Sequence, residues 1–257
     1  MSSLDYDGRV VWITGASSGI GRAVARQLAD QGADLVLSSR REEKLQSLAS
    51  ECADVRTTVL PLDVTERPSV EAATDTIEDK YGRLDVAFFN AGTYGDMPEA
   101  LDPDTIEKDF DVNFFGIVYC LNAALPLLRE SAVGRAVAMS SATAYGPLPR
   151  ASSYGASKAA VKYLVEALRF EWGVKDVDVD LSVVCPGFVE TPMTEQNDFP
   201  MPFMVDVEEA ADIITRGIAR GKKEISFPWP LILPLKLVNQ LPAFLYDRLI
   251  PYITGMA

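Results

Sequence analysis

The stretch Val10-Val-Trp-Ile-Thr-Gly-Ala-Ser-Ser-Gly-Ile-Gly21 decides how the rest of the chain is interpreted. Its first four residues are apolar, as in a strand buried on both faces of a parallel sheet. Gly15, Gly19 and Gly21 follow, and residues 22–30 have the apolar spacing of a helix. A strand, a glycine-rich turn and a helix N-terminus together predict an anion site, because backbone N–H groups and the helix dipole converge there. The alternative is a tight turn that binds nothing.

The spacing of these glycines, Thr14-Gly-x-x-x-Gly-x-Gly21, differs from the usual Gly-x-Gly-x-x-Gly of dinucleotide-binding folds. Glycine still suits the turn, because a β-carbon would block the close approach of a pyrophosphate. The residues between the glycines, Ser17, Ser18 and Ile20, are therefore candidate cofactor contacts.

The composition indicates a globular protein with a large core. Of the 257 residues, 48% are hydrophobic and 24% are charged, and the formal net charge is −13. So negative a chain argues against a nucleic acid or an anionic lipid surface as the main partner. An anionic cofactor remains compatible, because a few well-placed donors override the overall field locally.

The sequence contains no histidine. This excludes Ser-His-Asp hydrolysis, Cys-His proteolysis and His-ligated zinc, and we expect no metal site. Acid–base chemistry must then rely on Tyr, Lys, Cys or carboxylates. Cys52, Cys120 and Cys185 form no Cys-x-x-Cys pair, which favours a reducing, cytoplasmic location. The polar, acidic residues 1–8 do not resemble a signal peptide.

Apolar segments typical of strands alternate with segments of helical spacing along the chain. We expect strands at 10–13, 34–39, 56–62, 84–89, 135–140 and 177–184. We expect helices at 22–30, 40–52, 68–81, 103–130, 152–172 and 207–221. The alternation predicts a doubly wound parallel α/β sheet with helices on both faces, in one domain that spans residues 1–257.

The second expected strand ends in Ser39-Arg40, where dinucleotide folds meet the adenosine ribose. An acidic residue there selects NAD, whereas a neutral residue with an arginine admits the 2′-phosphate of NADP. Ser39 is uncharged and Arg40 can clamp a phosphate, so we expect a preference for NADP(H). Alternatively, Arg40 only begins the next helix and pairs with Glu43. Arg41 is a less favoured second contact.

Two further strand ends supply candidate contacts. Asp63, which Val64 follows, lies after the third strand, where it could meet the adenine amino group or could cap the next helix. Asn90, Ala91 and Gly92 follow the fourth strand, on the edge where open α/β sheets bind ligands. Their small size would let the backbone approach a cofactor ribose closely.

Tyr154 and Lys158 lie four residues apart in an expected helix and therefore share a face. The ordinary tyrosine pKa of about 10 is too high for acid–base work at neutral pH. A nearby ammonium group stabilises the phenolate, so we expect Lys158 to lower the pKa of Tyr154. Taken alone, the same pattern is also typical of a surface helix.

Two more polar residues occupy informative positions. Ser141 follows the fifth strand thirteen residues before Tyr154, and Ser140 is the alternative choice. Asn113 stands among apolar residues in the interior of a long helix, which is unusual unless its amide has a hydrogen-bonding role.

The motifs Thr14-Gly-x-x-x-Gly-Ile-Gly21, Asn90-Ala-Gly92, Asn113, Ser141, Tyr154-x-x-x-Lys158 and Pro186-Gly187 occur in a familiar order. Over residues 9–194 the chain resembles the classical short-chain dehydrogenases/reductases. The resemblance implies a single Rossmann-type domain with a central parallel sheet of about seven strands. It also implies hydride transfer between a nicotinamide cofactor and a carbonyl or secondary alcohol.

The resemblance assigns roles to individual residues. Tyr154 would be the general acid in carbonyl reduction and the general base in alcohol oxidation. Ser141 would hydrogen-bond the substrate oxygen. Lys158 would lower the pKa of Tyr154 and hold the nicotinamide ribose, and Asn113 would anchor a water that links Lys158 to solvent. The loop after the sixth strand would lie along the nicotinamide through Pro186, Gly187, Val189 and Thr191.

Apolar residues near these motifs suggest a hydrophobic ketone or secondary alcohol as substrate. Residues 191–205 suggest a mobile lid, which contains Met193, Phe199, Met201, Phe203 and Met204. The residues between Ser141 and Tyr154 suggest a second wall, formed by Ala144, Tyr145, Pro147 and Leu148. Alternatively, these side chains are buried in a subunit contact.

The C-terminal segment 226–253 is apolar and rich in proline. Its prolines and charged residues interrupt any run long enough to span a membrane. We expect a flap that closes the site or covers a neighbouring subunit. A segment that lies on a membrane surface is the alternative, against which the net charge weighs.

Together these expectations describe an NADP(H)-dependent oxidoreductase. The resemblance implies a homodimer or homotetramer built through the helices at 103–130 and 152–172. Two other interpretations are a non-catalytic protein that senses a dinucleotide and a membrane-surface enzyme that acts on lipids. A sensor would not need Tyr154 and Lys158 together, which argues against the first of these.

Overall fold

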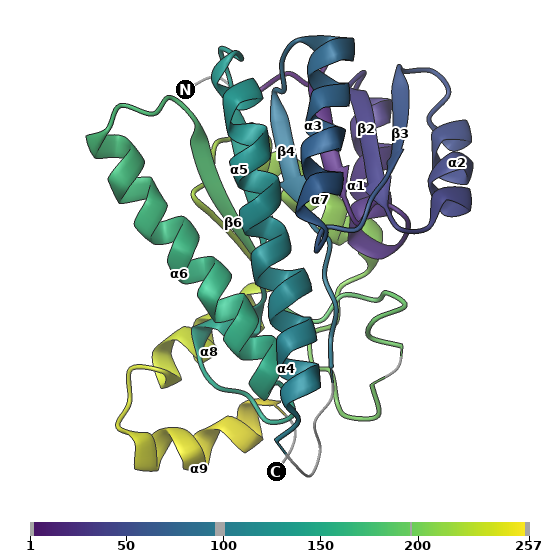
Figure 1. Ribbon diagram of the computed structural model, residues 1–257. Coiled ribbons are helices and arrows are strands. Elements are labelled where there is room, and N and C mark those ends of the chain that lie inside the picture. Colours follow the sequence, from purple (N-terminus) through teal and green to yellow (C-terminus); the bar gives the residue numbers. More distant parts are fainter. Residues whose placement is uncertain (1–2, 96–100, 196, 255–257) are drawn as a thin grey trace.

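Seven parallel strands form one sheet in the computed structural model, which describes residues 3–95, 101–195 and 197–254 (Figure 1). Their order across the sheet is β3-β2-β1-β4-β5-β6-β7. The strands are β1 (Val10–Thr14), β2 (Asp34–Ser39), β3 (Thr57–Pro61), β4 (Val86–Phe89), β5 (Arg135–Met139), β6 (Asp180–Pro186) and β7 (Glu224–Phe227). The doubly wound parallel α/β architecture that the sequence predicts is confirmed.

Helices cover both faces of the sheet. α3, α5 and α6 share one hydrophobic core with it, and α1, α2 and α7 share the other. The helices are α1 (Gly19–Asp30), α2 (Glu42–Glu51), α3 (Arg67–Tyr81), α4 (Pro103–Phe110), α5 (Gly116–Arg129), α6 (Ser152–Val174), α7 (Val207–Ala219), α8 (Trp229–Val238) and α9 (Ala243–Thr254). A π-helical turn η1 (Asp111–Phe115) and a 3₁₀ turn η2 (Ala142–Tyr145) complete the set.

β1 shows why the strands read as continuous apolar runs. Val10 and Trp12 belong to the core on one face of the sheet, and Val11 and Ile13 belong to the core on the other. Both faces are buried, so alternating polar residues have no place in this strand. β1 pairs with β2 on one side and β4 on the other, and the strand order reverses between them. That reversal places a crevice at the carboxyl ends of β1 and β4.

Several boundaries differ from the expected ones. α1 begins at Gly19 rather than at 22, α2 begins at Glu42 rather than at 40, and β6 begins at Asp180 rather than at 177. The first helix starts inside the glycine motif itself, so its first turn belongs to the anion site that the sequence predicts. The six strands located in the sequence are joined by a seventh, β7, whose four residues are too few for a clear periodic signal.

The helix expected at 103–130 consists of three consecutive segments, α4, η1 and α5. The π-turn between them holds Asn113, which is fully buried. By length and composition alone, the helical run Pro103–Arg129 is the one among the described residues that could cross a membrane. In this structure α5 packs against α3 and the sheet, as the core helix of a globular protein does.

The C-terminal segment 226–253 folds into the end of β7 and the two helices α8 and α9, drawn in yellow next to the lower end of α6 in Figure 1. Leu231, Ile232 and Leu235 of α8 are buried against the core that contains α6. Trp229 of α8 and Phe244 of α9 are exposed. The expected flap is therefore a helical pair with one buried side and one apolar side that remains open.

Candidate active site

The glycine turn after β1 forms a close-packed cradle. Gly15 adopts a positive φ of 68°, and a β-carbon there would lie 2.8 Å from the Cα of Ala91. A β-carbon on Gly21 would lie 2.5 Å from Nδ2 of Asn90 and 2.6 Å from the Gly15 carbonyl oxygen. These distances leave no room for a side chain at either position.

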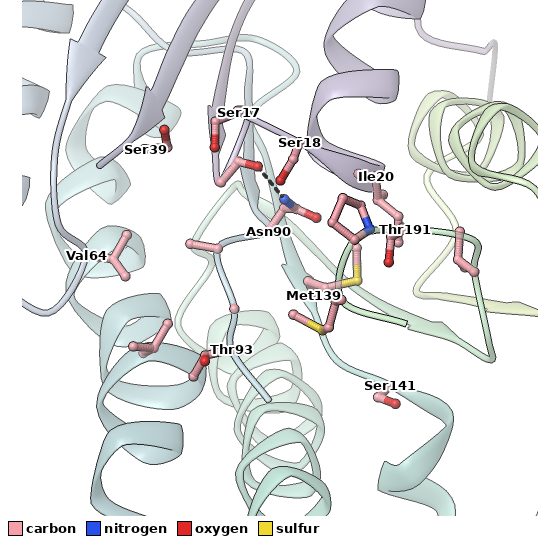
Figure 2. A pocket seen from close by; sticks show the side chains of 18 of the residues that line it. Ser17, Ser18, Ile20, Ser39, Val64, Asn90, Thr93, Met139, Ser141 and Thr191 are labelled. Carbon is pink, nitrogen blue, oxygen red and sulfur yellow. Dashed lines mark hydrogen bonds between the residues drawn. The ribbon is translucent and has the colours of Figure 1, made fainter. Parts of the chain in front are cut away.

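Asn90 fastens the end of β4 to this turn. Its Nδ2 donates to the carbonyl oxygens of Thr14 at 3.1 Å and Gly15 at 3.2 Å. The backbone N–H groups of Asn90 and Ala91 both donate to the Thr14 hydroxyl at 3.1 Å. Asn90 thus has a structural role at the crevice in addition to lining it, and Figure 2 shows it between the β1 turn and the cleft.

The two arginines after β2 point to different partners. The guanidinium of Arg41 donates to the Ser17 hydroxyl at 2.7 Å and to the Ser18 hydroxyl at 2.7 Å. Arg40 is mostly exposed and forms an ion pair with Asp63 at 3.7 Å. Arg40 does not pair with Glu43, because α2 begins only at Glu42 and Arg41 takes the capping position. Arg41, which the sequence ranked second, is therefore the arginine held against the glycine turn.

Asp63 does not cap α3, which has Glu66 at its N-cap position. Its carboxylate accepts from the backbone N–H of Thr65 at 3.0 Å and from the Thr65 hydroxyl at 2.9 Å. This local turn aims the remaining face of the carboxylate at Arg40 and at the rim of the cleft.

A single cleft of about 380 Å³ collects nearly all the residues that the sequence singled out. It extends from the arginines after β2 past the glycine turn to the first turns of α6. Figure 2 shows its walls at Ser39, Ser18 and Ser141. The lining residues named in advance are Gly15, Ser17, Ser18, Gly19, Ile20, Ser39, Arg40, Asp63, Val64, Asn90, Ala91, Gly92, Ser141, Tyr154, Lys158, Pro186, Gly187, Val189 and Thr191. Gly21 and Asn113 are buried and do not line the cleft.

Tyr154 and Lys158 share one face of α6, as their spacing predicts. Lys158 is 2% exposed, its Nζ donates to the Met139 carbonyl oxygen at 2.9 Å, and the same atom lies 5.8 Å from the centre of the Tyr154 ring. Burial lowers the pKa of Lys158 to about 8, against the opposing charge of Asp109. Lys158 is thus a buried ammonium group close to its titration point at neutral pH.

Tyr154 differs from the expectation in one respect. Burial raises its pKa to about 12, although the Ser141 hydroxyl lowers it, and the negative charge of Asp109 raises it further. The lysine does not overcome these effects in the free protein. Tyr154 is consequently protonated at neutral pH and able to donate a proton.

Ser141 and Ser140 play separate parts. Ser141 caps the η2 turn, where its hydroxyl accepts from the backbone N–H of Thr143 at 3.2 Å, and it lines the cleft beside Tyr154. The Ser140 hydroxyl donates to the backbone carbonyl of Lys158 at 2.7 Å. The hydroxyl that lowers the pKa of Tyr154 is therefore that of Ser141 and not that of Ser140.

Asn113 is fixed by three hydrogen bonds. Its Oδ1 accepts from the backbone N–H of Thr93 at 2.9 Å, and its Nδ2 donates to the Thr93 carbonyl oxygen and to the Ser157 hydroxyl at 2.9 and 3.0 Å. The Asn113 side chain thereby ties the π-turn to the loop after β4 and to α6. The hydrogen-bonding role that its odd position predicted is confirmed.

A second cavity of about 110 Å³ adjoins the cleft and shares Ser141 and Tyr154 with it. Its walls are mainly apolar and aromatic: Tyr94, Ala142, Leu148, Pro149, Phe188, Met193, Phe199 and Leu231 line it, together with Thr143, Ala151, Gly187, Thr194 and Asn197. Met193 and Phe199 of the expected lid line this cavity, whereas Phe203 and Met204 do not. Met193, Phe203 and Met204 are all exposed. Position 196 of the lid lies outside the described residues.

The lid and the loop before α6 are joined by Arg150. Arg150 forms an ion pair with Asp198 and lies over the ring of Phe199 at 5.1 Å. The Tyr94 hydroxyl donates to the Arg150 carbonyl oxygen at 3.0 Å. Three segments far apart in the chain therefore meet around the apolar cavity.

Tyr145 does not belong to this second wall. Its hydroxyl donates to Glu224 of β7 at 2.9 Å, and Lys236 of α8 donates to the same carboxylate at 2.5 Å. The hydroxyl of Tyr246 in α9 donates to the Pro147 carbonyl oxygen at 2.5 Å. The C-terminal helices thus hold the η2 loop that carries Ser141 and Leu148.

Sequence reasoning missed several residues of the site. Thr93 and Ser157 hold Asn113, and Tyr94 packs edge-to-face on Tyr154 with ring centres 5.5 Å apart. Tyr94 lies two residues after the Asn-Ala-Gly motif and could have been suspected as a neighbour of the cleft. Leu231 reaches the apolar cavity from α8, which no local pattern in the sequence indicates.

The cleft fits a dinucleotide cofactor. Its glycines leave a cradle that a β-carbon would fill, and the N-terminus of α1 opens into it. The Arg41 guanidinium and the Ser17 and Ser18 hydroxyls supply donors at one end. Within the described ranges, no group of three or more Cys, Asp or Glu side chains is arranged to hold a metal ion.

Comparisons with known proteins agree with this geometry. The family model described as short chain dehydrogenase matches residues 9–200. An 11-beta-hydroxysteroid dehydrogenase A from Sesamum indicum is 36% identical over 247 residues, which cover 88% of this chain and 70% of that protein.

Solved structures share the fold. A short-chain dehydrogenase/reductase from Burkholderia phymatum in complex with NAD superposes with a TM-score of 0.84 at 24% identity, over 92% of this chain and 95% of the other. An alcohol dehydrogenase from Thermococcus sibiricus complexed with 5-hydroxy-NADP superposes with a TM-score of 0.77 at 27% identity, over 86% and 96%. The chain belongs to the short-chain dehydrogenase/reductase family of NAD(P)-dependent oxidoreductases.

Proposed function

We propose that this protein is an NADP(H)-dependent oxidoreductase that interconverts a hydrophobic carbonyl compound and its secondary alcohol. The observation that carries the proposal is the continuity of the cleft. It runs from Arg41 to Tyr154 and Lys158, and there it opens beside an apolar cavity that shares Ser141 and Tyr154. One end suits an anionic cofactor and the other suits an apolar substrate.

The preference for NADP(H) rests on the end of β2. Ser39 places no carboxylate there, and Arg41 already binds two hydroxyls of the glycine turn. A 2′-phosphate next to these groups would receive charge-assisted hydrogen bonds from them. A ribose hydroxyl would offer the guanidinium no anionic partner. Arg40 adds a second, more exposed cation whose charge is partly offset by Asp63.

The acid–base role rests on Tyr154. Its pKa of about 12 keeps it protonated at neutral pH, as a proton donor in carbonyl reduction must be. Ser141 would hydrogen-bond the substrate oxygen as negative charge develops on it. Lys158 would stabilise the phenolate left on Tyr154. Asn113 holds the backbone of Thr93 and the hydroxyl of Ser157, the residue before the lysine. The nicotinamide cofactor, when bound, supplies or accepts the hydride.

The substrate class follows from the second cavity. Leu148, Phe188, Phe199 and Leu231 offer an apolar surface, and Met193 adapts to varied shapes. The relative from Sesamum indicum is named an 11-beta-hydroxysteroid dehydrogenase, and a bulky alicyclic or aryl ketone suits the same chemistry here. Residues 191–205 act as the lid over this cavity in our proposal.

We also propose a homo-oligomer in the cytoplasm, formed by a single domain. Phe115, at the junction of η1 with α5, and Tyr163 and Phe170 on α6 expose large apolar surfaces that a neighbouring subunit would cover. The open side of α8 and α9 offers a further place for a subunit or for peripheral membrane contact. The three cysteines are free and buried, which suits a reducing compartment.

Fluorescence titration with NADPH and NADH tests the cofactor proposal. We expect NADPH to bind more tightly, and Arg41→Ala to weaken NADPH binding by at least about tenfold through loss of charge-assisted bonds while NADH binding changes little. Arg40→Ala should have a smaller effect in the same direction. Arg129→Ala, at the exposed end of α5 away from the cleft, is the matched control. Equal losses for both cofactors would refute the preference.

Turnover of apolar ketones by Tyr154→Phe tests the chemistry. We expect the variant to lose roughly a hundred- to ten-thousandfold in kcat, the usual contribution of a general acid, while NADPH binding remains. Cofactor binding without turnover by the wild-type protein, over a broad panel of ketones and alcohols, would instead favour the dinucleotide sensor. Co-sedimentation with liposomes separates the lipid-directed alternative from both.

A further inference from the structure

The apolar cavity beside Tyr154 is small for a substrate site. Its volume is about 110 Å³, and it adjoins the cleft at Ser141 and Tyr154, which line both spaces. For comparison, an apolar cavity of about 150 Å³ engineered into another protein binds one benzene molecule. A substrate whose carbonyl oxygen meets the hydroxyls of Ser141 and Tyr154 therefore has room for about one ring beyond its reacting carbon.

Aromatic side chains form much of the wall around that space. Tyr94 packs edge-to-face on Tyr154, with ring centres 5.5 Å apart. Phe188 and Phe199 also line the cavity, and their rings meet at 62° with centres 6.1 Å apart. Aromatic rings prefer edge-to-face or offset contacts with one another, so this wall suits a single flat ring.

Arg150 fixes one of these rings from outside the cavity, which it does not line. Its guanidinium carbon lies 5.1 Å from the centre of the Phe199 ring, and its guanidinium pairs with the carboxylate of Asp198, the residue before that ring. The two paired side chains are 31% and 77% exposed, and an ion pair so open to water contributes little to stability by itself. The cation–π contact adds a second attachment, which acts on the Phe199 ring directly.

The backbone of Arg150 provides a third attachment. Its carbonyl oxygen accepts a hydrogen bond from the Tyr94 hydroxyl at 3.0 Å. The residue has a φ of 60°, in the left-handed region that side chains other than glycine rarely adopt. Such a conformation persists where surrounding contacts determine it, and it is concentrated at ligand sites. Arg150 thus connects Tyr94 and Phe199, two rings of the wall that lie far apart in the chain.

We propose that Arg150 and Asp198 form a clamp that keeps Phe199 in the cavity wall and thereby limits the substrate to ketones with a single ring beside the carbonyl group. The proposal rests on the proposed function and narrows its substrate class. Neither Arg150 nor Asp198 lines the cavity, so both determine specificity through Phe199. A ketone with fused rings would have to displace Phe199, and the clamp opposes this displacement.

Competition between two ketones tests the size limit. The quantity to measure is kcat/KM for reduction by NADPH of acetophenone, which has one ring, and of cortisone, which has four fused rings. We expect the wild-type protein to favour acetophenone by at least about tenfold, because cortisone overfills the cavity. Asp198→Asn should reduce this preference by about two- to fivefold, the range expected for the loss of an exposed ion pair. Phe199→Ala, which removes the wall itself, should reduce it further.

The charge of Arg150 provides the control variants. Arg150→Lys keeps a cation opposite Asp198 and should retain most of the preference, whereas Arg150→Gln should relax it as Asp198→Asn does. The double variant Arg150→Gln/Asp198→Asn should relax it no more than Arg150→Gln alone, because one interaction is removed in both cases. Glu71→Gln breaks an exposed ion pair with Arg67 on α3 and should leave the preference unchanged. A residue that only stabilised the fold would lower kcat/KM for both ketones in the same proportion, and that result in Asp198→Asn would overturn the proposal.

Binding to the complex with NADP⁺ separates the size limit from the chemistry, because this form of the cofactor has no hydride to give. Isothermal titration calorimetry of that complex should show binding of acetophenone and much weaker binding of cortisone. If acetophenone binds but NADPH reduces no ketone, the proposed function fails and the size limit stands. If the wild-type protein binds cortisone as tightly as acetophenone, or binds neither ketone, the clamp does not select the substrate and the proposal fails.

Discussion

The cradle around Gly15 and the cluster around Lys158 lie at two ends of one cleft, yet they are built on opposite principles. In the cradle, Asn90 binds two backbone carbonyls and the Thr14 hydroxyl receives two backbone N–H groups. In the cluster, Lys158 is buried without an ion pair and Asp109 has no hydrogen-bond partner among the described residues. One end is satisfied by its own backbone, and the other is not.

The difference corresponds to the work that each end would do. A cradle must hold one shape for an anionic ligand, so close packing and complete hydrogen bonding serve it. A proton-transfer site needs groups whose protonation responds to a nearby charge, and burial without full pairing produces this sensitivity. We infer that the cradle around Gly15 contributes more to the free energy of unfolding than the cluster around Lys158 does.

The largest effect is expected for Gly15→Ala. The new β-carbon would meet the backbone of Ala91 at 2.8 Å and would also disfavour the positive φ of 68°. Overpacking and left-handed strain together should cost about 3 kcal/mol in the free energy of unfolding, measured by urea denaturation. NADPH binding should be lost in the same variant.

Gly82→Ala separates the two causes. Gly82 ends α3 with a similar φ of 67°, but a β-carbon there meets nothing within 4 Å. Gly82→Ala should lower the free energy of unfolding by only about 1 kcal/mol, which is the effect of the left-handed backbone conformation alone. If both variants lost equal stability, the close packing of the cradle would contribute nothing, and the comparison between the two ends would fail.

The sequence predicted the cradle well because its determinants are local. The apolar run of β1, the three glycines and the Asn-Ala-Gly after β4 each follow from backbone rules that apply within a few residues. Parallel pairing then brings the carboxyl ends of neighbouring strands together, as Thr14 beside Ser38 and Phe89 shows. The partners along the cleft could thus be named before their distances were known.

The sequence predicted which residues form the cluster around Lys158, but it did not predict how their pKa values shift. Lys158 was expected to lower the pKa of Tyr154, yet burial and Asp109 raise it in the free protein. Asp109 looks like a solvated residue of a polar helix, and only the packing of α4 against α6 buries it. Arg40 was ranked above Arg41 because it directly follows Ser39, yet the structure pairs Arg41, at the N-cap of α2, with the hydroxyls of Ser17 and Ser18. Each error concerns contacts between distant segments.

Lys158→Met should have an effect of intermediate size on the free energy of unfolding and, unlike Gly15→Ala, should increase it. The pKa of Lys158 is about 8 in the folded protein and about 10.4 in an unfolded chain, so the unfolded state binds more protons between these values. The buried ammonium therefore destabilises the fold at pH 7, and this cost is lost as the pH rises from about 8 to above about 10.4. Lys158→Met also removes the hydrogen bond to the Met139 carbonyl oxygen, which offsets part of the gain. The variant should therefore be about 2 kcal/mol more stable than the wild type at pH 7.

Urea denaturation of both proteins at pH 7 and pH 10 measures this gain. The advantage of Lys158→Met should be full at pH 7 and mostly lost at pH 10, close to the unfolded pKa of about 10.4, while ketone reduction is lost at both. A variant that is less stable at pH 7 would show that the catalytic end is as well satisfied as the cradle. Lys162→Met, at a lysine that pairs with Glu166 on the same helix, should not become more stable and serves as the control.

The smallest effect concerns the C-terminal helices, which supply conventional hydrogen bonds to the catalytic end. Tyr246→Phe removes the bond of 2.5 Å to the Pro147 carbonyl oxygen and should cost about 1 kcal/mol in the free energy of unfolding. Because Leu148 adjoins this bond and lines the apolar cavity, KM for an apolar ketone should rise while the Kd for NADPH stays the same. Tyr252→Phe, on the exposed side of the same helix, should change neither quantity. An equal rise in the Kd for NADPH would mean that α9 supports the whole cleft, and that the two ends are less independent than their hydrogen bonding suggests.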